Sequence, residues 1–159
     1  MPEPKNDGKD SKDELIELLN ELRITLPGVQ VLFAFLLAVP FTNRFTKITD
    51  TQTNAFFVSL LATAIGSVLL IAPSAYHRLR WREASDEVLL QVSNRLAIAG
   101  TVCVAIGMAS AVFLITDVVF KETMTVLVTT GVSATFVWFW YGLPLLHRAR
   151  HDAVERRAR

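Results

Sequence analysis

The chain has 159 residues, 52% of them hydrophobic, and its mean hydropathy of +0.38 excludes an ordinary soluble domain of this length. The net charge of +1 is uninformative, but charged residues gather at 1–23, 78–95 and 148–159 and are almost absent between these regions. A bilayer imposes such segregation, because a charge at its centre costs roughly 2.5–3.5 kcal/mol. The single cysteine, Cys103, excludes an intramolecular disulfide and a zinc framework, so we interpret it as a small packing residue.

The N-terminal region divides into two parts. Residues 1–12 are polar and contain Pro, Gly and alternating charges, so we expect a disordered tail. In 13–26, leucines at helical spacing lie opposite three glutamates, which predicts an amphipathic interfacial helix. This helix lies on the membrane interface or against the cytoplasmic ends of the other helices. Alternatively it docks on a partner protein, because its acidic face suits anionic lipid poorly.

A transmembrane domain over 27–147 follows. Pro27-Gly28 ends the amphipathic segment and opens the first apolar run, and Thr49 to Gln52 has capping-box spacing ahead of the second. The four expected spans are about 28–45, 54–75, 96–119 and 124–146. The predicted fold is therefore an all-α membrane protein with four transmembrane helices in an up-down bundle, preceded by the amphipathic N-terminal helix.

Residues 72–82 form the cytoplasmic corner after the second span. Pro73 is expected to end that span, with aromatic anchors at Tyr76 and Trp81 and three arginines immediately around them. The next helix is expected to run without a break from Ser85 to about Phe120. The basic tail, 148–159, should lie near anionic lipid headgroups.

Small residues at four-residue spacing mark candidate helix contacts. They are Ala62 and Gly66 in the second span and Ala99, Cys103, Gly107 and Ala111 in the third. Small side chains let two helices approach closely within a membrane.

The distribution of Lys and Arg predicts the orientation. Thirteen of the sixteen fall in the N-terminal segment, the middle loop and the tail, while Arg44, Lys47 and Lys121 occupy the other loops. The positive-inside rule then places both termini in the cytoplasm of a multi-pass protein of the cell membrane.

Little in the sequence suggests chemistry. No ionisable residue lies deep inside a span, and Asp117, at the outer end of the third, is the nearest case. It is either an interfacial carboxylate paired with Arg44 or Lys47, or a proton- or cation-responsive group. His147 and His151 are spaced i, i+4 but have no further ligand, so we expect no metal and no cofactor. No nucleophile–base set, P-loop or nucleic-acid surface is recognisable, so we expect neither an enzyme nor a nucleic-acid-binding protein.

Several strings resemble a known family. LPGVQVLFAFLL at 26–37, APSAYHR at 72–78, NRLA at 94–97 and WYGLPL at 140–145 resemble a domain-of-unknown-function family of small bacterial four-span integral membrane proteins. The likeness covers nearly all of 14–148. It implies architecture and no settled activity, although some members carry a sodium:proton antiporter label.

These features favour a non-enzymatic membrane protein that acts at its cytoplasmic face through a partner protein, a second copy of itself, or anionic lipid headgroups. The alternative is a small oligomeric transporter or cation/proton antiporter, which at four spans would need to dimerise. The candidate polar surface at the cytoplasmic face consists of His77, Arg78, Arg80, Arg82 and Arg95. Arg95 is expected either to pair with Glu17 or Glu21 of the amphipathic helix or to extend to the phosphates of the lipid headgroups.

Overall fold

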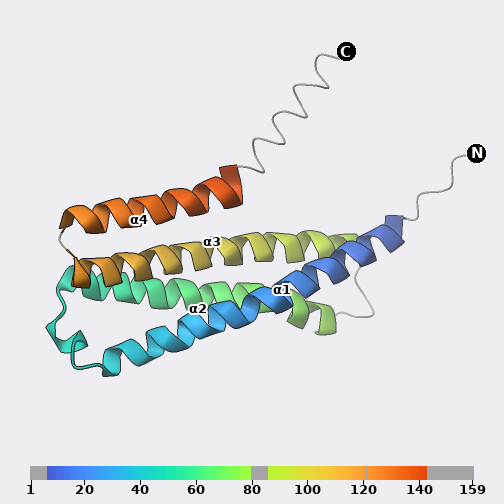
Figure 1. Cartoon of the computed structure of the whole chain (residues 1–159). Coiled ribbons are helices and arrows are strands. Elements are labelled where there is room, and N and C mark those ends of the chain that lie inside the picture. Colours follow the sequence, from blue (N-terminus) through green and yellow to red (C-terminus); the bar gives the residue numbers. More distant parts are fainter. Residues whose placement is uncertain (1–6, 80–85, 121, 143–159) are drawn as a thin grey trace, which may run out of the picture.

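Figure 1 shows the computed structural model of the chain, which describes residues 7–79, 86–120 and 122–142. This part of the chain is all-α, without strands. Its helices are α1 (Asp7–Ala38), α2 (Asp50–Leu79), α3 (Asp86–Val119) and α4 (Glu122–Val137), joined by the 3-10 turns η1 (Val39–Phe41) and η2 (Phe45–Lys47) and continued by the π-helical turn η3 (Trp138–Gly142). Four helices are long and apolar enough to cross a membrane, as the sequence predicts.

The helices alternate in direction. We call the end of the molecule where α1 begins the proximal end, and the end where α1 stops the distal end (Figure 1). The α1–α2 loop and the turn between α3 and α4 lie at the distal end.

α1 is one continuous helix, whereas the sequence predicts a break at Pro27. The helix begins at Asp7, inside the expected disordered tail, and continues through Pro27 to Ala38, so 13–26 is not a separate element. Proline lacks the N–H that would bond the carbonyl of Arg23. However, Leu22 and Val29, on either side of Pro27, are buried in one apolar cluster. Packing on both sides of the proline therefore holds the helix together, as commonly occurs in membrane helices.

α2 also continues through a proline and begins with the predicted cap. Pro73 is buried and the helix extends to Leu79, beyond the expected end of the span. At the start, the N–H of Thr49 donates to Oε1 of Gln52 at 3.0 Å, and the N–H of Gln52 donates to Oγ1 of Thr49 at 3.3 Å. This reciprocal pair confirms the capping box. α3 runs unbroken, also as expected.

α1, α2 and α3 pack together with a seven-residue period. The most buried apolar residues of α1 are Leu15, Leu22, Val29 and Leu36, spaced by seven. This is the repeat of coiled-coil seams, in which about 3.5 residues per turn face the partner helix.

α2 and α3 form the closest pair of helices. A methyl group at Gly66 would lie 2.9 Å from Cγ2 of Val104, and one at Gly107 would overlap Oγ1 of Thr63. The Ser59 hydroxyl, fully buried, donates to the carbonyl oxygen of Gly107 at 2.8 Å. The interface therefore depends on close backbone approach and on interhelical hydrogen bonding. Both features are expected in a membrane, where no hydrophobic driving force favours helix association.

The small residues singled out in the sequence only partly follow this interface. Gly66, Gly107 and Ala111 are buried, Ala62 and Cys103 are half-buried, and Ala99 is exposed. The contact passes through Gly100 instead, where an added methyl would lie 2.8 Å from Leu70 Cγ. A four-residue stripe drifts away from a 3.5-residue seam over several turns, which explains the difference at Ala99.

α4 lies at the edge of the bundle, against α3. Among the described elements it packs on α3 and its own continuation η3, and Thr125 is its buried residue. The four spans therefore comprise a three-helix bundle with a peripheral fourth helix (Figure 1).

Candidate functional site

At the distal end, the Asp117 carboxylate bonds to an amide side chain and forms no ion pair within the described part of the chain. Nε2 of Gln52 donates to Oδ2 of Asp117 at 2.8 Å, which joins the first turn of α2 to the last turns of α3. The Gln52 side chain thus accepts a hydrogen bond in the α2 cap and donates one to the carboxylate. Neither Arg44 nor Lys47 forms an ion pair with Asp117, although all three side chains are described. The expected ion pair of Asp117 with Arg44 or Lys47 is therefore not formed. The register of α2 against α3 places Gln52 next to the carboxylate instead.

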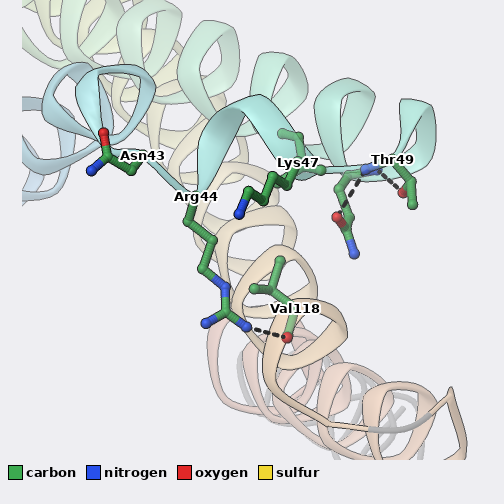
Figure 2. A pocket seen from close by; sticks show the side chains of 7 residues that line it. Asn43, Arg44, Lys47, Thr49 and Val118 are labelled. Atoms are coloured by element: carbon green, nitrogen blue, oxygen red, sulfur yellow. Dashed lines mark hydrogen bonds between the residues drawn. The ribbon is translucent and has the colours of Figure 1, made fainter.

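Arg44 instead caps α3. Its Nη2 donates to the carbonyl oxygen of Val118 at 3.3 Å (Figure 2). The last carbonyls of a helix have no intrahelical donor and carry the negative end of the helix dipole, so a guanidinium there is favourable. The arginine is exposed and spans from the η1–η2 loop to the end of α3.

A hollow of about 590 Å³ opens beside Arg44 and Gln52. Its lining residues are Asn43, Arg44, Lys47, Ile48, Thr49, Gln52 and Val118. Figure 2 shows Arg44 and Lys47 extending from the same short loop. Two cationic side chains and no carboxylate line this hollow, which makes it electropositive. From the sequence, Arg44 and Lys47 are recognised as outer-loop charges and as candidate partners of Asp117, and no hollow is predicted. Their spacing three apart, just ahead of the capping box, is the signal that could have identified it.

A second hollow lies at the proximal end, between α1 and α3. Its volume is about 370 Å³, and it is lined by Glu14, Glu17, Leu18, Glu21, Leu90, Gln91 and Asn94. We call it the acidic groove. Its three carboxylates are exposed. Arg95 is exposed as well and forms no ion pair with Glu17 or Glu21, so the expected link across the bundle is absent between these described side chains.

The remaining predicted site residues are only partly within the described chain. α2 includes His77 and Arg78, whereas Arg80, Arg82 and the basic tail with His147 and His151 lie outside the described residues. Among the residues that the structure describes, no group of three or more His, Cys, Asp or Glu side chains is arranged to hold a metal ion.

Comparison with known proteins identifies one family. A family model described as a family of unknown function, DUF6328, matches residues 8–144. This stretch includes nearly all of α1 and the whole of α2, α3 and α4. No curated protein and no solved structure matches the chain.

Proposed function

The chain belongs to the DUF6328 family of unknown function, and we propose that it is a non-enzymatic multi-pass membrane protein whose acidic groove binds a basic partner protein. The observation that carries the proposal is the set of three exposed carboxylates, Glu14, Glu17 and Glu21, which no described cation neutralises.

The electrostatics of α1 support this role. Glu14 and Glu17 are spaced i, i+3, and Glu17 and Glu21 are spaced i, i+4, so each pair destabilises an isolated helix by roughly 0.2–0.5 kcal/mol. A basic segment in the groove would convert this repulsion into attraction. Ile16 and Ile24 are also exposed on α1, at 57% and 81%, and would add apolar contact beside the charges.

The length of α1 supports a position outside the lipid. Its 32 residues extend ~48 Å, whereas the hydrocarbon core needs ~30 Å. The surplus accommodates the acidic turns beyond the bilayer. On the Lys and Arg distribution we place this proximal end in the cytoplasm, with Arg78, Arg80, Arg82 and Arg95 near anionic headgroups. A cysteine introduced at Lys5 should react with an impermeant reagent only after the cells are opened, and labelling of intact cells would reverse this orientation.

Substitutions of glutamate by glutamine remove the charge of the acidic groove and keep the size of the side chains, so they test the groove without disrupting the fold. Removal of the N-terminal segment is unsuitable, because Leu15 and Leu22 are buried. We would place a photo-crosslinking residue at Gln91 in the full chain in native membranes and compare it with the same chain carrying Glu14, Glu17 and Glu21 changed to Gln. The matched control is Glu122→Gln, an exposed acid at the distal end. The proposal requires a crosslinked basic partner that the triple variant loses and the control keeps; equal crosslinking in all three refutes it.

A transporter is the second candidate, favoured by the position of α4. Because α4 packs on α3 alone, its other faces are open to a second copy, and a dimer would enclose a pathway between subunits. Oligomeric mass in mild detergent and cation or proton flux in proteoliposomes test this together. A dimer whose flux falls in Asp117→Asn would support an antiporter, and a monomer without flux would eliminate it.

A further inference from the structure

An apolar groove adjoins the electropositive hollow at the distal end. The groove has a volume of about 310 Å³ and is lined by Phe35, Val39, Thr42, Arg44, Phe45, Ile48, Leu114, Ile115, Val118 and Val119. Arg44, Ile48 and Val118 line both spaces, so the two adjoin at these residues. One site thus has a cationic part and an almost wholly apolar part.

We propose that this composite site binds one anionic phospholipid, with its phosphate between Arg44 and Lys47 and an acyl chain in the apolar groove. A guanidinium has five N–H donors, and the carbonyl of Val118 engages one nitrogen of Arg44. The other nitrogens of the Arg44 guanidinium and the Lys47 ammonium make no hydrogen bond or ion pair within the described part of the chain, and both residues line the hollow, where a phosphate can accept from them. The contact with Val118 also holds Arg44 in place, which lowers the cost of ordering it when the lipid binds.

Two further features favour a lipid over a soluble phosphate. The carboxylate of Asp117 does not line the hollow and forms no ion pair with either cation, so both cations stay available to a bound anion. A soluble anion would also leave the apolar groove filled with water, whereas an acyl chain covers it with matching surface. The site lies at an end of apolar helices, where headgroups and acyl chains meet.

Lipid binding to the purified full-length protein tests the proposal. Native mass spectrometry would count phosphatidylglycerol and phosphatidylcholine bound to the wild type and to Lys47→Gln, with Arg23→Gln, an exposed cation of α1, as the matched control. Lys47 makes no side-chain hydrogen bond, so its substitution leaves the loop intact. Arg44→Gln would follow, with helicity checked by circular dichroism, because it also removes the α3 cap.

We expect phosphatidylglycerol to bind in preference to phosphatidylcholine and to bind about fivefold more weakly to Lys47→Gln, the factor for one cation at an anionic headgroup. Arg23→Gln should bind as the wild type does. Glycerol phosphate, which has the headgroup chemistry without acyl chains, should not displace the lipid. Equal binding of both lipids, unchanged binding by Lys47→Gln, or displacement by glycerol phosphate would each overturn the assignment.

Discussion

Gly107 provides the strictest test of the α2–α3 interface. An alanine methyl there would overlap Oγ1 of Thr63 and lie 3.2 Å from the carbonyl oxygen of Ser59. The threonine side chain can rotate, but the backbone of α2 cannot move without separating the helices. At Gly131, on α4, the same methyl meets nothing within 4 Å. Gly107→Ala and Gly131→Ala therefore make the same chemical change in a closed and in an open environment.

The two variants should differ in stability by about 1–3 kcal/mol, the usual cost of overpacking a tight interface. The helix-propensity gain of about 1 kcal/mol on replacing glycine is common to both variants and cancels. The free energy of unfolding is obtained from SDS titration in mixed micelles, followed by near-UV circular dichroism. If Gly107→Ala is as stable as Gly131→Ala, the helices do not approach as closely as described and the reasoning fails.

Two hydrogen-bond predictions use the same assay. Ser59→Ala should cost about 1 kcal/mol, because it removes the interhelical bond to Gly107, whereas Ser67→Ala should be nearly neutral, because that hydroxyl bonds a carbonyl of its own helix. Equal losses of stability in Ser59→Ala and Ser67→Ala would show that the interhelical bond to Gly107 does not stabilise the protein. Thr49→Ala should cost about 1 kcal/mol through loss of the α2 cap, and Thr46→Ala, which removes only a bond within the loop, should cost less. The reverse order would show that the cap does not stabilise α2.

The sequence predicts the helices well, because lipid imposes long apolar runs that local composition reveals. The capping box at Thr49 and Gln52 was predictable for a related reason, since both partners are three residues apart. The seam between α2 and α3 was only partly predictable. Small residues indicate where helices can approach, but the choice of Gly100 over Ala99 depends on a supercoil period that one helix does not specify.

The candidate site was harder to predict because its contacts join distant parts of the chain. Asp117 was recognisable as the carboxylate nearest a span, but its partner, Gln52, lies 65 residues away. Arg44 bonds a backbone carbonyl of Val118, and a carbonyl leaves no signature in the sequence. Side-chain charge alone suggested that Asp117 pairs with Arg44 or Lys47, because such a comparison ignores the unpaired carbonyls at a helix end.

Pro27 tests the largest difference between the sequence-based expectation and the structure. If α1 is one helix, Pro27→Ala restores the N–H that bonds the carbonyl of Arg23, and since Pro27 is exposed no packing is lost. The variant should then be more stable by about 1–3 kcal/mol. If the chain turns at Pro27, alanine instead raises the conformational entropy of the unfolded chain, which lowers the free energy of unfolding by about 0.4–1 kcal/mol. Pro73→Ala is the comparison, because that proline is buried and its replacement also loses packing. If Pro27→Ala is less stable than the wild type in the SDS titration, the chain turns at Pro27 and the amphipathic segment before it is a separate helix.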